Sequence, residues 1–421
     1  MDTSTNPLDS AFGFGAFTPV TTPPVVVKTI TNKTQLKAAL DAAAGIFPPT
    51  NTVLRLSASD DYDFRNEALQ TFIIRAKNVT IEAAPGQRVV LKNFGLLLAL
   101  DGIDNILIQD LVFHSDGDAD NARDAIKLFA SERPAPPPGT PPLTTQNTNA
   151  GSVRITHCSF DGYFDISIDS RSSAVSRRLL VTIDQCLFFD ARPGRPKAVG
   201  NAVPEFVNRG AINFGSLENP ADRGGPQLVG NAYATVAANV FVDVWRRCPR
   251  VATGNFGHVY NNLVFRWGNG NFEDDEANKT NTWLGMAVGG GSGVVGTGVP
   301  NGTALIEANR FIPVKDKKAL EKTIEINPNT KISLGSNANE FDSLDGTNRN
   351  KTLTVPAANS AAIDIATVYS NVNRTAPTVA VPTAAEWLTI VARAGPRQGT
   401  ATAAETAAKK AVTDVLSPSP S

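Results

Sequence analysis

The feature that most constrains the fold is a short pattern that recurs six times along the middle of the chain. Each copy alternates apolar and polar residues, passes through a polar, Asn or Cys position, and ends in Phe. The copies ILIQDLVF, VRITHCSF, VTIDQCLF, ATVAANVF, HVYNNLVF and ALIEANRF end at Phe113, Phe160, Phe188, Phe241, Phe265 and Phe311. Their spacing is one or two multiples of about 25 residues, which is a length expected for one coil of a solenoid.

Each copy alternates like a short strand, and helical periodicity is nearly absent between residues 70 and 315. The pattern therefore predicts an all-β parallel β-helix whose coils turn Phe, Ile and Val inward and stack on one another. Asn239, Asn261 and Asn309 fall near the turns, where we expect a side-chain ladder. A β-sandwich or a propeller is the alternative, but neither accounts for this interval.

The organisation predicted around this core has three parts. Residues 1–25 are expected to be an extended leader, residues 26–395 a single β-helix domain, and residues 396–421 a flexible tail. Within the domain, residues 34–44 predict a helix that covers the open end, and a second helix is expected around Trp387. Residues 131–150, 190–233 and 268–302 predict long loops on one face.

Composition excludes several classes of function. The 421 residues carry a net charge of −1 and a pI near 6.4, so there is no basic excess of the kind that nucleic-acid binding requires. No apolar run reaches membrane-spanning length, and we expect a monomer. Cys158 and Cys186 occupy equivalent places in two repeats, which is consistent with buried packing or with a single bridge, and Cys248 is the third cysteine.

Three aspartates are candidate metal ligands. Asp124 opens the predicted strand DAIKLF, and Asp165 and Asp169 lie four residues apart in FDISID, which places both carboxylates on one face of an extended segment. Carboxylates from adjacent coils would form the all-oxygen set that suits Ca²⁺. Solvated edge charges are the alternative interpretation. We interpret His157 and His258 as structural.

The segment RCPRVATGNFGHVYNN, which contains Arg247, resembles the Arg-x-Pro-x-x-Arg-x-Gly-x-x-His-x-x-Asn-Asn signature of the pectate lyase family. DAIKLF, VRITHCSF and DISID precede it in the family's order, and the resemblance runs from roughly Phe12 to Phe311. It implies a right-handed parallel β-helix, with long loops on one face and short helices at the ends. It also implies a secreted, calcium-dependent lyase that cleaves polygalacturonate, or pectin, by β-elimination. Residues 1–17 lack the regions of a secretory signal.

Carried over by position, the resemblance implies that Arg247 is the catalytic base and that Asp124, Asp165 and Asp169 bind Ca²⁺. The family's substrate-binding lysine has two candidate counterparts, Lys197 and Arg209.

The chain also departs from the family pattern. Ala252 stands at the second arginine of the signature, and Arg250 could serve in its place. Ala122 and Thr156 replace aspartates, and one residue is inserted before His258.

The resemblance leaves alternatives open. One is a pectin lyase that acts on methylated substrate without metal, although Asp165 and Asp169 argue against it. The others are a β-helical hydrolase with clustered catalytic aspartates and a non-catalytic polyuronate-binding protein. Trp245, Trp267 and Trp283 could stack on sugar rings or pack in the core.

Overall fold

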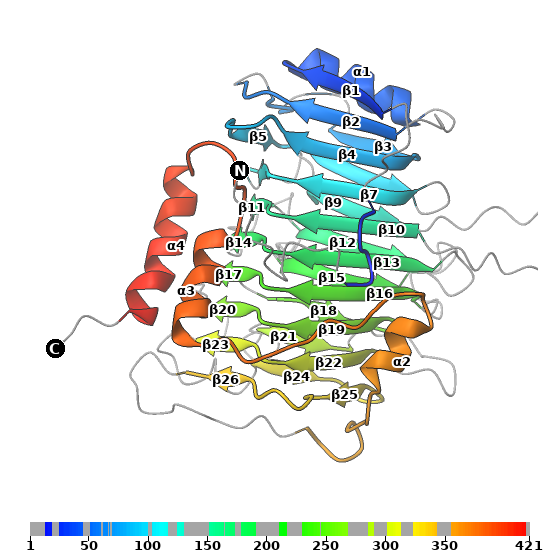
Figure 1. Cartoon of the computed structure of the whole chain (residues 1–421), viewed down its shortest axis with the longest axis vertical. Coiled ribbons are helices and arrows are strands. Elements are labelled where there is room, and N and C mark those ends of the chain that lie inside the picture. Colours follow the sequence, from blue (N-terminus) through cyan, green and yellow to red (C-terminus); the bar gives the residue numbers. More distant parts are fainter. Residues whose placement is uncertain are drawn as a thin grey trace, which may run out of the picture.

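Three parallel sheets, A, B and C, form the body of the molecule (Figure 1). The computed structural model describes residues 13–18, 25–44, 51–59, 62–65, 67, 70–99, 103–116, 124–129, 151–163, 165–172, 178–190, 210–216, 230–244, 246–267, 285–289, 301–312, 323–342 and 355–417. The chain passes through sheets C, A and B in turn, so each coil adds one strand to each sheet. Such crossovers between parallel strands are right-handed, and the predicted right-handed parallel β-helix is confirmed.

The strands are distributed as follows. Sheet A contains β1 (Val25–Ile30), β2 (Asn51–Leu56), β4 (Lys77–Ala83), β7 (Asp104–Gln109), β10 (Gly151–Thr156), β13 (Leu179–Asp184), β16 (Ala232–Ala237), β19 (Phe256–Tyr260), β22 (Thr303–Glu307) and β25 (Lys331–Ser333). Sheet B contains β5 (Val89–Lys92), β8 (Leu111–His114), β11 (Ser159–Asp161), β14 (Leu187–Phe189), β17 (Val240–Val242), β20 (Leu263–Phe265), β23 (Arg310–Ile312) and β26 (Glu340–Phe341). Sheet C contains β3 (Thr71–Ile74), β6 (Gly95–Ala99), β9 (Ile126–Phe129), β12 (Ile166–Ser172), β15 (Gly210–Ser216), β18 (Arg250–Val251), β21 (Met286–Val288) and β24 (Ile324–Ile326).

A column of phenylalanines runs through the core along sheet B. Phe113, Phe160, Phe188 and Phe241 stack on successive coils with ring centroids 4.9 to 5.1 Å apart. Strand register aligns these residues one above the other, as the repeat predicts. Offset aromatic pairs of this kind add to the stabilisation from burial.

The fifth copy of the repeat, HVYNNLVF, is shifted by one residue from the alignment that its sequence suggests. Val264 pairs with Phe241 and with Phe311, so it occupies the core column. Phe265 pairs with Val242 and Ile312 on the outer face of sheet B. A shift of one residue moves a side chain to the opposite face of a strand.

The asparagine ladder lies at the turn from sheet A to sheet B and runs through Asn239, Asn262, Asn309 and Asn339. From Asn262 on, each Oδ1 accepts a hydrogen bond from the backbone N–H of the preceding member at 3.0 Å, and Asn239 Oδ1 accepts one from the Cys186 N–H at 2.9 Å. The sequence-based assignment of Asn261 to this ladder is wrong. Asn261 adopts the left-handed conformation that Ala238 and Ala308 adopt at the equivalent turn position, with φ between 52° and 55°.

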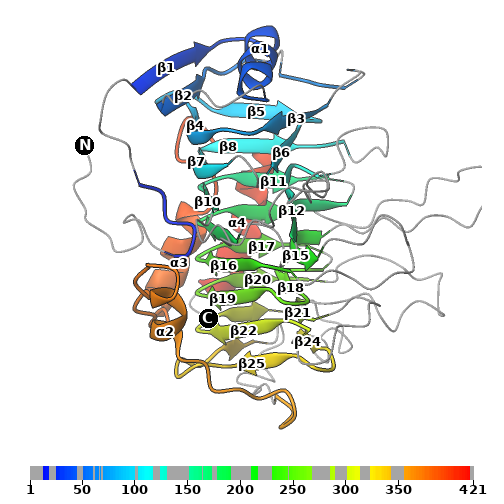
Figure 2. The ribbon, with the colours of Figure 1, turned by 90° about the vertical axis from the view of Figure 1, so that its right-hand side faces the viewer.

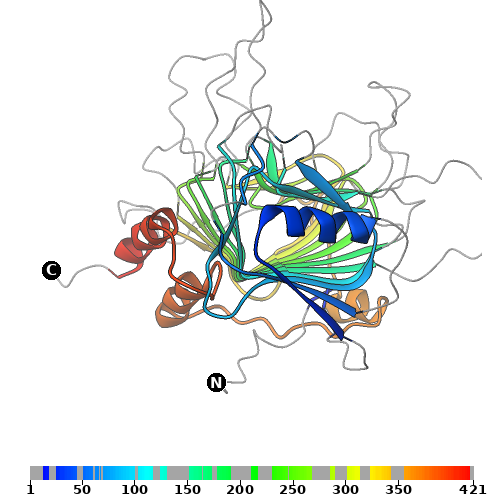
Figure 3. The same cartoon turned by 90° about the horizontal axis from the view of Figure 1, so that it is seen from above.

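The helices cover the end and two sides of the β-helix. The predicted helix α1 (Lys33–Ala44) lies across the N-terminal end of the coils, as seen from the side and from above (Figures 2 and 3). α2 (Ile365–Ser370) lies beside sheet A, where Tyr369 stacks on Phe14 with centroids 3.9 Å apart. The helix predicted around Trp387 is α3 (Ala384–Arg393), and it packs on the outer face of sheet B with α4 (Ala403–Leu416).

The flexible tail predicted for residues 396–421 is wrong for Ala403–Leu416, which form α4. A capping box joins Thr402 and Glu405 at its start, and Ala408 and Val412 form its buried stripe. Glu405 is fully buried, where it forms an ion pair with Arg88 and accepts a hydrogen bond from Ser159. The alternation of alanine with charged residues conceals this amphipathic pattern in the sequence.

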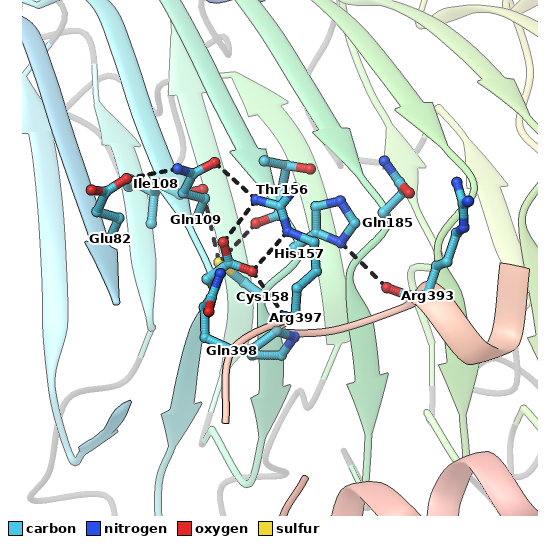
Figure 4. Close-up of polar contacts among 12 residues, drawn as sticks. Glu82, Ile108, Gln109, Thr156, His157, Cys158, Gln185, Arg393, Arg397 and Gln398 are labelled. Atoms are coloured by element: carbon cyan, nitrogen blue, oxygen red, sulfur yellow. Dashed lines mark hydrogen bonds and ion pairs between the residues drawn. The ribbon is translucent and has the colours of Figure 1, made fainter. Parts of the chain in front are cut away.

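The connection between α3 and α4 is fixed to sheet A by polar contacts (Figure 4). Arg397 forms an ion pair with Asp110 at 2.8 Å, and His157 Nδ1 lies 3.3 Å from the carbonyl oxygen of Arg393. Burial and the Arg397 charge lower the pKa of His157 to about 4. These contacts agree with a structural role for His157.

Other sequence-based assignments concern buried side chains. Cys158, Cys186 and Cys248 are free and buried, so the Cys158–Cys186 bridge is not formed. Trp267 lies in the core with its ring edge-on to Phe311, whereas residues 245 and 283 lie outside the described residues. Among the helices that the structure describes, none combines the length and apolar character needed to cross a membrane.

Substituting Asn262→Ala should lower the free energy of unfolding by about 3 kcal/mol, because it leaves several buried backbone and ladder groups without partners. Asn262 Nδ2 donates to the carbonyl oxygens of Val236 and Tyr260, and its Oδ1 accepts from Asn239. Chemical denaturation measures the change. Asn371→Ala, at an exposed position, is the matched control and should change stability by less than about 0.5 kcal/mol. If both substitutions lower the free energy of unfolding equally, the ladder does not contribute to stability.

Candidate active site

A row of polar side chains crosses the outer face of sheet C. Strand register places Lys127 of β9, Asp169 of β12, Asn213 of β15 and Arg250 of β18 side by side. Their chain neighbours point inward to the core, because side chains alternate along a strand. Adjacent strands lie about 4.8 Å apart, so members of the row can touch. Asn213 Nδ2 donates to Asp169 Oδ1 at 2.7 Å.

The three predicted carboxylates converge beside this row. Asp124 lies just before β9 and Asp165 just before β12, whereas Asp169 lies within β12. Burial raises the pKa of Asp124 to about 6, and the neighbouring charges of Asp169 and Asp165 add to the rise, although Lys127 opposes it. All three carboxylates are therefore within electrostatic reach of one another.

Arg247 interacts electrostatically with these three carboxylates, and its backbone has a left-handed conformation. Its φ is 62°, the left-handed conformation that non-glycine residues rarely adopt. Its carbonyl oxygen accepts a hydrogen bond from the Ile212 N–H at 2.9 Å. A Cβ at Gly210 would lie 3.1 Å from Arg247 Cδ, so glycine at this position leaves room for the arginine. Ala238 and Ala308 adopt the same conformation at turns, so what sets Arg247 apart is its charged surroundings.

The surroundings of Arg247 lower the affinity of its side chain for a proton. Burial lowers the pKa of Arg247, and the nearby Arg171 lowers it further, whereas Asp165 and Asp169 oppose the change. Burial and repulsion from Arg247 also lower the pKa of Arg246 to about 9 and that of Arg250 to about 10. A guanidinium in such surroundings is easier to deprotonate than one in water.

These charged residues form a single group, which we call the sheet C cluster. It comprises Asp124, Lys127, Asp165, Asp169, Arg171, Arg246, Arg247 and Arg250. The structure thus brings together the sequence-predicted residues Asp124, Asp165, Asp169, Arg247 and Arg250. The other two, Lys197 and Arg209, lie outside the described residues. Ala252 is buried, with its N–H bonded to the Phe214 carbonyl oxygen.

Four members of this site were missed by the sequence interpretation: Lys127, Arg171, Arg246 and Asn213. The alternation in DAIKLF and DISIDSRS could have indicated two of them, because Lys127 and Arg171 share the outward face with Asp169.

His258 of the signature belongs to sheet A instead. There Nε2 lies 3.0 Å from Glu307 Oε1 and Nδ1 lies 3.2 Å from the Tyr369 hydroxyl, which confirms its structural role.

Ca²⁺ takes six to eight oxygen ligands, and the carboxylate oxygens of this cluster are already engaged. Both oxygens of Asp124 already accept hydrogen bonds, Oδ1 from the Ile166 N–H at 3.3 Å and Oδ2 from Lys127 Nζ at 2.8 Å. Both oxygens of Asp169 do so too, from Asn213 and from Arg171 Nε at 2.8 Å. Within the described ranges, no group of three or more His, Cys, Asp or Glu residues is arranged to hold a metal ion. This arrangement does not fit a calcium site.

Comparison with known proteins shows which of them have a similar fold. No protein-family model matches the chain, and no curated protein matches its sequence. Among solved structures, an arginine-to-phenylalanine variant of pectate lyase from Xanthomonas campestris matches with a TM-score of 0.50 at 17% identity, over 91% of this chain and 98% of that one. Pectate lyase C from Erwinia chrysanthemi matches with a TM-score of 0.43 at 16% identity, over 84% and 92%. The first of these matches shows that the chain shares the parallel β-helix fold of a pectate lyase.

The raised pKa of Asp124 predicts a specific dependence of stability on pH. The folded state binds this proton more tightly than the unfolded chain, so the contribution to stability is complete below about pH 4 and is lost as the pH rises through about 6. Asp124→Asn removes this loss, and at neutral pH the variant should be more stable than the wild type by up to about 3 kcal/mol. Chemical denaturation between these pH values measures the difference.

The control for this prediction is Asp414→Asn, which removes an exposed carboxylate from an ion pair on α4. It should leave the pH dependence of the wild type unchanged. If Asp124→Asn also retains that dependence, the carboxyl of Asp124 is not the group that titrates.

Proposed function

We propose that this protein is a polysaccharide lyase that cleaves an acidic polyuronate, of the polygalacturonate type, by β-elimination with Arg247 as the base. The observation that carries the proposal is the half-buried Arg247, held among the carboxylates and guanidinium groups of the sheet C cluster. The signature around Arg247 and the pectate lyase fold support the same reaction class.

In the proposed reaction, the neutral guanidine of Arg247 takes the proton from the carbon next to the uronate carboxylate. The electron pair left behind forms a carbon–carbon double bond, and the bond to the glycosidic oxygen at the neighbouring carbon breaks. The departing oxygen is protonated by the Arg247 guanidinium or by solvent. No water is consumed, so the paired acid and base carboxylates of a glycosidase are not needed.

Positive charge near the substrate carboxylate would stabilise the electron density that develops there during proton removal. The cluster offers the guanidinium groups of Arg171, Arg246 and Arg250 for this role. Arg250 is fixed by a 3.0 Å hydrogen bond from its Nε to the Gly289 carbonyl oxygen. A free uronate carboxylate suits these cations better than a methyl ester, which carries no charge. Pectin lyase activity on methylated substrate is therefore the second candidate.

Secretion and a monomeric state stay predictions from the sequence, whereas the pairing of the carboxylates does not support the calcium dependence that the sequence predicts. The roles of Lys197 and Arg209 in substrate binding also stay predictions. The buried Ala252, in place of the signature's second arginine, is the observation that favours the non-catalytic binding protein. Absence of turnover together with retained polyuronate binding would identify that alternative.

Replacing the base should abolish turnover without unfolding the protein. We expect Arg247→Ala and Arg247→Lys to lower kcat on polygalacturonate by at least about 1,000-fold, because general base catalysis contributes on this scale. The ultraviolet absorbance of the unsaturated product measures the rate. The control Arg55→Lys alters an arginine of sheet A that pairs with Glu82 and should retain wild-type activity. Near-normal turnover in either Arg247 variant would exclude Arg247 from the mechanism.

The proposal also predicts the direction of the pH dependence. Arg247 must be neutral to accept the proton. Burial lowers its pKa, but the lowering starts from the high pKa of a guanidinium. The rate constant kcat/KM should therefore rise with pH from neutral into the alkaline range. Initial rates in overlapping buffers measure this profile, and an acidic optimum with a falling alkaline limb would contradict an arginine base.

A further inference from the structure

The carboxylates expected to bind a metal ion are already paired with cations of the same chain. Lys127 Nζ lies 2.8 Å from Asp124 Oδ2, and Arg171 Nε lies 2.8 Å from Asp169 Oδ2. Lys127 follows Asp124 by three residues, whereas Arg171 follows Asp169 by two and shares its face of β12. Both pairs therefore arise from local sequence on two hydrogen-bonded strands, β9 and β12.

The side chains of Lys127 and Arg171 lie close enough to interact electrostatically with the three carboxylates. Strand register sets Lys127 directly beside Asp169, and its ammonium group lies 2.8 Å from Asp124 Oδ2. The Arg171 guanidinium interacts electrostatically with Asp169, Asp165 and Asp124. A divalent cation bridging these coils would need the same space and the same oxygens.

The exposure of the four side chains shows which groups face solvent. The carboxylates of Asp124 and Asp169 are 7% and 1% exposed, whereas Lys127 and Arg171 are 34% and 35% exposed. The cations thus separate the carboxylates from the solvent through which a polymer substrate would approach. An incoming anion would meet an ammonium and a guanidinium group before it met a carboxylate.

From this geometry we infer that Lys127 and Arg171 are built-in cations that take the place of a bound Ca²⁺ in the sheet C cluster. Their two positive charges neutralise the carboxylates and face the substrate's uronate carboxylate, so the site needs no metal. The statement about metal binding depends only on the geometry. The statement about substrate rests on the proposed function.

Calcium titration by isothermal calorimetry tests the inference without any assay of activity. Chelator-treated wild-type protein should show no Ca²⁺ binding at the cluster. The double variant Lys127→Ala/Arg171→Ala should gain Ca²⁺ affinity by at least about 100-fold, because affinity follows the net charge of the ligand set. Its thermal unfolding midpoint should rise with added Ca²⁺. The control Arg55→Ala removes a cation of similar exposure, 38%, from sheet A and should gain nothing.

Two results would overturn the inference. One is Ca²⁺ binding by the wild-type protein that Asp169→Asn removes, and this measurement does not depend on the double variant folding. The other is a folded double variant that still binds no Ca²⁺. On the substrate side, the wild type should retain lyase activity on polygalacturonate in excess chelator. Absence of activity on every polyuronate would refute the proposed function while leaving the metal-binding result to stand by itself.

Discussion

The structure depends on the in-register stacking of parallel strands from one coil to the next. Buried backbone groups must be paired. Here the N–H and C=O groups of each strand bond to those of the neighbouring strands, and the Phe column and the asparagine ladder fix the register. Val264 and Asn262 show how strict this register is. The chain places a valine in the aromatic column, and Phe265 outside it, to keep Asn262 in the ladder. Because the register is fixed, a residue's position in one coil determines which residues it meets in the next.

The sheet C cluster is a direct consequence of that stacking. Residues distant in sequence, such as Asp169 and Arg250, share one outer row because their strands lie side by side with Asn213 between them. Burial, together with the like charges collected in one place, raises the pKa of Asp124 and lowers those of Arg246 and Arg250. The resulting cost in stability is characteristic of functional sites. On this account, Lys127 and Arg171 offset part of that cost by neutralising the carboxylates from within the chain.

Much of the fold was predictable because the repeated strand pattern determines how the coils stack. Alternation and interval predicted the β-helix, and helical patterns at residues 34–44 and around Trp387 predicted α1 and α3, whereas α4 was missed because alanines weaken its apolar stripe. The site was predictable where residue type alone indicates chemistry, as for Arg247 and the three aspartates. Lys127 and Arg171 were missed because their importance depends on ion pairs that only strand register reveals. The one-residue error at Asn261 has the same origin, since the sequence offers two adjacent asparagines and only the turn geometry distinguishes them.

On the proposed function, the sheet C cluster performs elimination with the chain's own charges. This is tested most directly by mass spectrometry of the products that chelator-treated protein forms from polygalacturonate in oxygen-18-labelled water. We expect fragments that carry an unsaturated terminal sugar and no label, because elimination consumes no water. Saturated fragments that carry the label would contradict it, since they would show hydrolysis.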